Sequence, residues 1–202
     1  MAFIESLESR RLFAVSGGVL ALRAVHAEEV TVVADVRTFK HGLVVDRAAI
    51  KADLKRLGTL RTDASLGATA DADILSLYDT IKTDVATGDA EINKYAGELV
   101  KFETLDAKHP STTLANDAST ADTNLTTAAN NMVSQVSADS DTTTVDNDLN
   151  AIASANSGDT QTQTDVTTME TDAANNLTTL NNDVNTLVNT DVQDLQNFYG
   201  NP

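Results

Sequence analysis

The stretch that decides the fold runs from Asp71 to Lys108 and reads DADILSLYDTIKTDVATGDAEINKYAGELVKFETLDAK. Two rows of mostly apolar residues pass through it, each with a seven-residue step, and the second row lies four residues beyond the first. Rows with this spacing share one face of an α-helix, so the stretch predicts a long amphipathic helix. The rows are Ile74, Ile81, Gly88, Tyr95 and Phe102, and Tyr78, Val85, Ile92 and Leu99.

Helical periodicity resumes after Pro110. The helix predicted from Asp71 should end at His109, because the residue before a proline is displaced from the α region. Beyond it, apolar residues recur every eleven positions, which is about 3.67 residues per turn and predicts straight or slightly right-handed helices. The rows are Leu114, Leu125 and Val136; Val166, Leu177, Val188 and Tyr199; and Ala173, Val184 and Leu195.

The composition of residues 109–202 opposes these helices. Thr, Asn and Asp supply 46 of the 94 residues, and all three are poor helix formers. Packing must offset this preference, and the alternative is a partly disordered, Thr-rich stalk. The weakest points should be 137–144 and 156–164. In the second of these, Gly158 can end one helix and Asp159 can cap the next.

Residues 28–68 predict one or two short helices and their connectors. Val32, Val36, Phe39 and Leu43 have helical spacing, with Lys40, His41 and Gly42 placed as a C-terminus. Asp46 can cap a second helix, which Gly58 weakens or ends. The alternative of a strand at 30–33 leaves that strand without a partner.

The predicted fold is all-α: an elongated antiparallel three-helix bundle with one or two short helices before it. The bundle domain spans 69–200, with helices at about 71–108, 111–156 and 159–199. At 1.5 Å per residue, each arm would be about 60 Å long and the bundle a rod.

Residues 1–27 have the layout of a cleaved export signal. Arg10 and Arg11 precede the apolar run 12–22, and small residues stand at the third and last positions before a cut after Ala27. The run is shorter than the about 20 residues that a membrane-spanning helix needs. The alternative is that 3–22 form an amphipathic first helix of the domain.

Two resemblances concern this leader. Residues 9–13, Ser-Arg-Arg-Leu-Phe, resemble the twin-arginine export motif, with acidic Glu5 and Glu8 as a departure. Residues 3–14 resemble the LEPR-XLL leader of bacterial surface and extracellular proteins, with Ser9 in place of its proline and Phe13 in place of a leucine. Both resemblances imply export by a bacterium, and neither implies an activity.

The charge of the chain is strongly negative, at −16. Residues 109–202 hold 13 acidic residues and no lysine or arginine. Nucleic acid is not an expected partner, because phosphate binding needs a basic footprint. The chain has no cysteine, which excludes disulfides and thiolate chemistry.

The sequence predicts no catalytic, cofactor-binding or metal-binding residue, no cofactor and no enzyme activity. His26, His41 and His109 form no metal-binding pair, and no nucleophile elbow, Walker loop or dinucleotide fingerprint occurs. The acidic cluster Asp139, Asp141, Asp146 and Asp148 begins like a calcium loop. Thr144 and Asn150, however, replace the loop's glycine and glutamate, so the cluster is interpreted as a solvated face.

The expected function is that of an exported, non-catalytic structural or interaction protein of the bacterial periplasm, cell surface or extracellular space. Its partner would be an unknown protein or surface, or a second copy docking through the seam 74–102, and stable membrane insertion is not expected. The alternative is an acidic extracellular protein that binds calcium.

Overall fold

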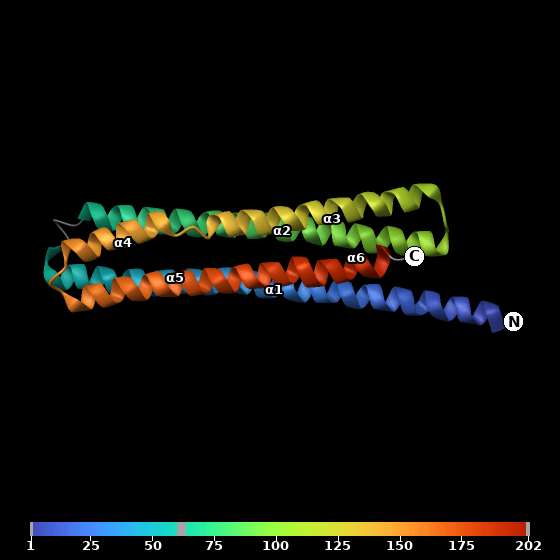
Figure 1. Ribbon diagram of the computed structural model, residues 1–202, viewed down its shortest axis with the longest axis horizontal. Helices are drawn as coiled ribbons and strands as arrows, with labels where there is room; N and C mark the ends of the chain where they lie inside the picture. Colours follow the sequence, from blue (N-terminus) through green and yellow to red (C-terminus); the bar gives the residue numbers. More distant parts are fainter. Residues whose placement is uncertain (1, 60–63, 201–202) are drawn as a thin grey trace. The chain divides into compact units, whose positions relative to one another are not determined.

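The computed structural model describes residues 2–59 and 64–200, with side chains described for 17–59 and 65–199. Every described element is helical, which confirms the all-α helical bundle (Figure 1). The elements are α1 (Ala2–Leu57), α2 (Ala64–Lys108), α3 (Thr112–Asp139), α4 (Thr143–Ala155), α5 (Thr160–Thr186), the π-helix η2 (Leu187–Val192) and α6 (Gln193–Gly200).

The first helix corrects the expectation of short helices in residues 28–68. One helix, α1, covers the whole stretch as far as Leu57. Gly42 does not end a helix; it lies inside α1, where an added Cβ would stand 3.1 Å from the Nδ2 atom of Asn176 in α5. Asp46 is no N-cap either, because it lies within α1 and is buried. The bundle therefore has four long helical segments rather than three.

Three helix ends fall where the sequence places them. Gly58 has φ +72, a conformation that glycine adopts freely, and it follows the last residue of α1. Helix α2 ends at Lys108, directly before His109 and Pro110. Asp159 accepts a hydrogen bond of 2.9 Å from the backbone N–H of Thr162 and so caps α5.

The segment predicted at 111–156 is divided in two. Helices α3 and α4 are separated at residues 140–142, inside the weak stretch 137–144. Asp141 accepts a hydrogen bond of 3.0 Å from the backbone N–H of Thr143, which satisfies a donor at the start of α4. A short polar side chain that binds the backbone in this way competes with helix continuation.

The threonine-rich half is helical in the described residues rather than a disordered stalk. Many of its threonine hydroxyls donate to the carbonyl oxygen four residues earlier, which satisfies these hydroxyls on exposed helix faces. The apolar rows supply the packing: Leu125, Val136, Leu177 and Leu195 are buried. The hydroxyl donors of this kind in α3 and α5 are Thr120, Thr123, Thr126, Thr127, Thr164, Thr167, Thr168, Thr171, Thr178 and Thr179.

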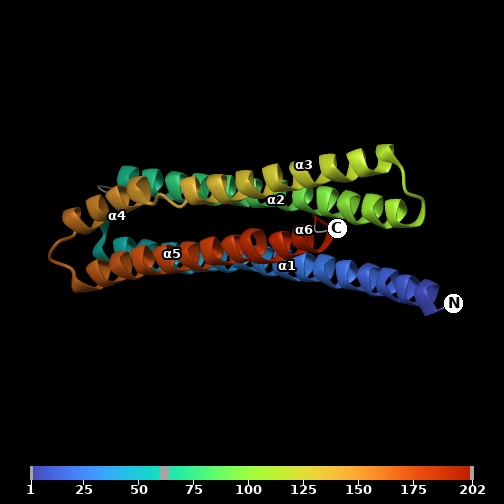
Figure 2. The ribbon, with the colours of Figure 1, turned by 45° about the vertical axis from the view of Figure 1, so that its right-hand side comes forward.

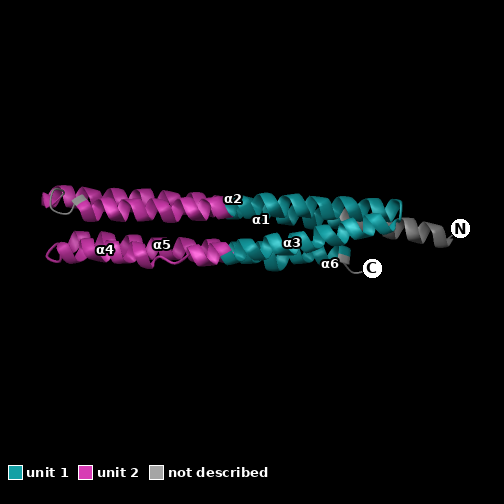
Figure 3. Ribbon diagram, turned by 90° about the horizontal axis from the view of Figure 1, so that it is seen from above, with its two compact units in different colours: residues 1–32, 85–134, 183–202 teal, residues 33–84, 135–182 magenta. Residues whose placement is uncertain are grey.

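The described helices contribute to two compact units (Figure 3). Unit 2 comprises 33–84 and 135–182, and within it α1 lies beside α5 while α2 lies beside α4 (Figure 2). Its core includes Phe39, Ile74, Leu149 and Met169.

Unit 1 comprises 1–32, 85–134 and 183–202. Ile92, Leu125 and Met132 are among its fully buried side chains. Gly88 of α2 leaves room for Met132 of α3, since an added Cβ would stand 2.6 Å from the methionine Cγ. The seam 74–102 is therefore core, and its residues are buried or half-buried against the chain's own helices.

Candidate functional site

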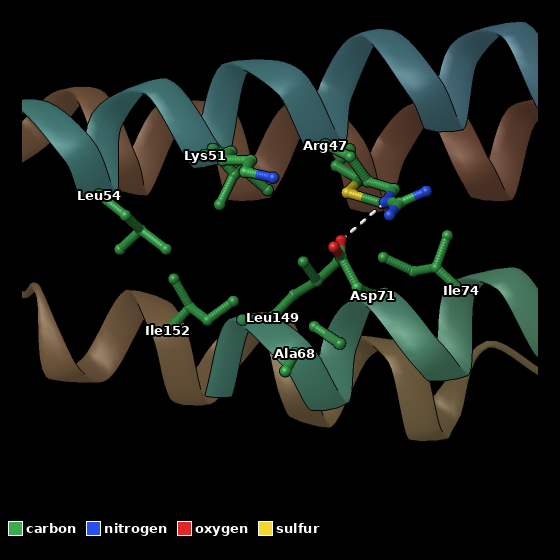
Figure 4. A pocket seen from close by; sticks show the side chains of 12 residues that line it. Arg47, Lys51, Leu54, Ala68, Asp71, Ile74, Leu149 and Ile152 are labelled. Carbon is green, nitrogen blue, oxygen red and sulfur yellow. Dashed lines mark hydrogen bonds and ion pairs between the residues drawn. The ribbon is translucent and has the colours of Figure 1, made fainter. Parts of the chain in front are cut away.

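An apolar cavity of about 230 Å³ lies within unit 2, among α1, α2, α4 and α5 (Figure 4). Branched and long apolar side chains from all four helices face it, while α2 contributes the small residues Gly67, Ala68 and Ala70. These short side chains fill less space than a leucine or isoleucine would, and the volume stays open. The larger apolar lining residues are Ile50, Leu54, Ile74, Leu149, Ile152 and Met169.

An ion pair stands at the rim of this cavity. Arg47 Nε of α1 donates to Asp71 Oδ1 of α2 over 2.7 Å, and Lys51 lies nearby (Figure 4). The hydrogen bond from Arg47 lowers the pKa of Asp71 below its ordinary value. The same bond raises the pKa of Arg47. Both groups therefore stay charged at neutral pH.

The lining of this cavity is mostly apolar. Arg47, Lys51 and Asp71 are its ionisable members, and it contains no hydroxyl, thiol or imidazole. A carboxylate with a lowered pKa is a weak base and holds no proton to donate near neutral pH.

Carboxyl groups from different helices face one another elsewhere in the bundle. In unit 1, Glu29 of α1 is buried and lies near Asp89 of α2, and its pKa is raised to about 8 by burial and by the charge of Asp89. In unit 2, burial and a hydrogen-bonding contact with Asp84 raise the pKa of Asp139 to about 6. Both pKa values lie well above the ordinary values of about 3.9 for aspartate and 4.3 for glutamate.

The acidic cluster predicted as a solvated face is only partly one. Asp141 and Asp146 accept hydrogen bonds from the hydroxyls of Thr143 and Thr142. Asp139 and Asp148, by contrast, each bury Oδ2 toward α2, which corrects the sequence interpretation. Among the residues with described side chains, no group of three or more His, Cys, Asp or Glu is placed to hold a metal ion.

One of the three histidines, His26, lies near a facing acid, because it opposes the rise that burial causes in the pKa of Asp89. His26 and His41 are exposed on α1, and His109 follows the end of α2. His41 was expected at a helix C-terminus, but α1 continues for another sixteen residues to Leu57. The helix continues because the apolar stripe stays in register on both sides of Gly42, with Phe39 and Leu43 both buried.

The facing acids were missed by sequence reasoning. Asp73 and Asp84 each directly precede a buried seam residue, Ile74 and Val85. An acid at the edge of a buried seam is held close to the neighbouring helix. This position next to the seam is the signal in the sequence that could have identified the facing acids. Which acid it meets depends on the register between helices, which the sequence does not state.

Comparison with protein-family models, with curated proteins and with solved structures found no match to this chain. Within the described part of the chain, none of the helices combines the length and the apolar character required to cross a membrane.

Proposed function

We propose that the chain is an exported, non-catalytic helical protein that serves as a structural or interaction component of the bacterial envelope or extracellular space. The observation that carries the proposal is the uneven distribution of surface groups between the two halves of the chain. All 14 lysines and arginines precede residue 109, and the 13 acids of residues 109–202 have no lysine or arginine among them.

The exposed apolar side chains follow the same division. Among the described residues after Ala27, α1 and α2 carry five of the six exposed large hydrophobic side chains, and Phe198 of α6 is the sixth. In unit 2, Val44 and Leu75 line a shallow hollow with Lys40 and Tyr78. Mixed apolar and cationic groups favour docking, whereas an acidic surface repels other acidic surfaces. We therefore assign docking to α1 and α2, and colloidal solubility to α3–α6.

Export is tested by fractionating cells that express the chain with a C-terminal epitope. We expect the protein outside the cytoplasm, with a mature N-terminus after Ala27. The double change Arg10→Lys and Arg11→Lys should block export through a twin-arginine route, while Arg37→Lys leaves it intact. A protein that stays in the cytosol and begins at Ala2 would refute the export part of the proposal.

Docking is tested by cosedimentation of the purified protein with isolated bacterial envelopes. Val44→Lys combined with Leu75→Lys should reduce binding, because both place charge in the hollow on α1 and α2. Thr164→Lys combined with Thr168→Lys is the matched control, since it adds the same charge on the exposed face of α5. Equal loss in both proteins would point to simple electrostatics instead.

Calcium binding is a second candidate, favoured by the facing carboxyl groups. Calcium takes six to eight oxygen ligands, and each facing pair supplies two side chains. Calorimetry with calcium chloride separates the candidates: saturable heat with micromolar affinity supports calcium binding, and weak, salt-sensitive heat supports the structural protein.

A further inference from the structure

A buried aspartate, Asp53 of α1, meets the half-buried Asp165 of α5 within unit 2. Asp53 is only 6% exposed, and its Oδ1 accepts a hydrogen bond of 3.2 Å from Arg56. Its Oδ2 is buried and receives no hydrogen bond from any described donor. The carboxyl group of Asp53 lies within hydrogen-bonding distance of the Asp165 carboxyl group on α5. Gln161 donates to Asp165 Oδ1 over 2.8 Å, so it is Asp53 Oδ2 that faces another acceptor without a donor of its own.

The neighbouring cation does not supply that donor. Arg56 divides its N–H groups between Asp53 and Asp159, with Nη1 donating to Asp159 Oδ1 over 3.1 Å. Asp46, which also lies within unit 2, is close enough to Asp165 for their charges to repel, and it adds negative potential around the pair. The carboxyl groups around Asp53 therefore outnumber the cations there, which favours a bound cation or proton at Asp53.

The same arrangement recurs at two further places in unit 2. Asp148 of α4 meets Asp73 of α2, and Asp139 at the end of α3 meets Asp84 of α2. In each case Oδ2 of the first aspartate is buried and accepts no hydrogen bond. Asp73 and Asp84 are the charged groups that face these two oxygens across the helix interface.

Elementary electrostatics decides what such a pair holds. Two carboxylates in contact cannot both stay charged, so one takes a proton and its O–H donates to the other, forming a strong, charge-assisted hydrogen bond. Burial accordingly raises the pKa of Asp53 and of Asp148 above the ordinary range. Asp139 at the C-terminal end of α3 also meets the negative end of the helix dipole.

We propose that the pairs Asp53/Asp165, Asp73/Asp148 and Asp84/Asp139 are proton-binding sites, each holding one proton between two helices. Folding of unit 2 then takes up protons in mildly acidic solution, and acid strengthens the contacts of α1 with α5 and of α2 with α3 and α4. A divalent cation is the rival occupant. It needs more ligands than two carboxyl groups, and among the described residues no third His, Cys, Asp or Glu side chain joins any pair.

The test uses Asp139→Asn, Asp84→Asn and the double variant in the full chain. Proton uptake on folding is read from the pH dependence of urea unfolding between about pH 4 and 7. Uptake of one proton changes the unfolding constant tenfold per pH unit. Because asparagine donates an N–H where the proton was, each single variant should lose this tenfold dependence near pH 5. Because the two aspartates share one proton, the double variant should lose no more than either single variant.

Asp79→Asn is the matched control, because it removes the same charge from an exposed position of α2 in the same unit. It should leave proton uptake unchanged. Additive losses in the double variant, or unchanged uptake in both single variants, would overturn the proposal. So would saturable calcium binding to the wild-type protein that disappears in Asp139→Asn. If Asp139→Asn fails to fold, Asp165→Asn provides the same comparison, and carboxyl carbon NMR of the wild-type protein reads the shared proton directly.

Discussion

Replacing Glu29 by glutamine should stabilise the protein, and the gain should depend on pH. Glu29 lies on α1 and is 5% exposed, with Oε1 buried and accepting no hydrogen bond. Burial and the nearby charge of Asp89 raise its pKa to about 8, although a hydrogen bond from Asn93 opposes the shift. Glutamine has the shape of the protonated acid and a permanent N–H donor.

The magnitude follows from the pKa values of the folded and unfolded chain. Glu29 has an ordinary pKa of 4.5 and a folded pKa of about 8, so between these values the folded protein holds a proton that the unfolded chain lacks. Stability therefore falls as pH rises through this window. At 1.36 kcal/mol per pH unit, the penalty at pH 7 is about 3 kcal/mol, and at pH 4 it is close to zero. Glu29→Gln removes this penalty and should raise the free energy of unfolding by about that amount at pH 7 only.

The assay is urea unfolding followed by far-ultraviolet circular dichroism at both pH values. Glu91→Gln is the control, because it makes the same chemical substitution at an exposed position on the same helix as Asp89. The control should shift stability by less than about 0.5 kcal/mol. A gain from Glu29→Gln that is the same at both pH values, or a loss at pH 7, would refute the reasoning.

Three further results are expected from thermal or urea unfolding. Gly88→Ala should destabilise unit 1 by about 1–3 kcal/mol, because the new Cβ overlaps Met132, and a stability equal to wild type would show that the contact is loose. Ile92→Ala should cost about 2–5 kcal/mol, since Ile92 is fully buried. Raising salt from about 0.01 M to 0.15 M should increase the melting temperature by screening the 13 acids of residues 109–202; a lower melting temperature would mean that attractive pairs dominate.

The sequence predicts most of the helices because their signals are local. The seam 74–102, the end of α2 before Pro110 and the cap at Asp159 each depend on a few adjacent residues. The error at 28–68 arose because Gly42 and Asp46 carry the same local signals as real helix ends. Packing decides otherwise: Gly42 allows a close approach of Asn176, and the stripe from Val32 to Leu43 gains more from burial in one continuous helix than from a turn.

The paired carboxyl groups were beyond prediction for a different reason. Spacing shows which acids lie next to a buried seam, as Asp73 and Asp84 do, but not which residue of a distant helix stands opposite. Asp148 and Asp165 are 75 and 112 residues from their partners Asp73 and Asp53 along the chain. The cavity in unit 2 likewise depends on four helices meeting around Gly67 and Ala68, a geometry that no single stretch encodes.

No lysine or arginine follows Lys108, so the acidic residues after it have few cationic hydrogen-bond donors nearby in the sequence. Asp159 accepts hydrogen bonds from Arg56 of α1 and from Thr162, and these bonds lower the pKa of Asp159. Asp141 and Asp146 use threonine hydroxyls, as Asp122 uses the amide of Gln196. Where a helix interface offers only another acid, as at Asp139, a proton is the remaining donor.

These groups depend on pH in opposite directions. Protonation strengthens the acid pairs as pH falls toward about 4, whereas Asp159 and Asp71, whose pKa values are lowered, lose their ion pairs only as pH falls further. Stability should therefore peak in mild acid rather than at neutrality. If the protein is exported as proposed, it is exposed to surroundings whose pH the cell does not buffer. A bundle that gains donors as protons become available stays folded where a protein built on lysine and carboxylate pairs would weaken.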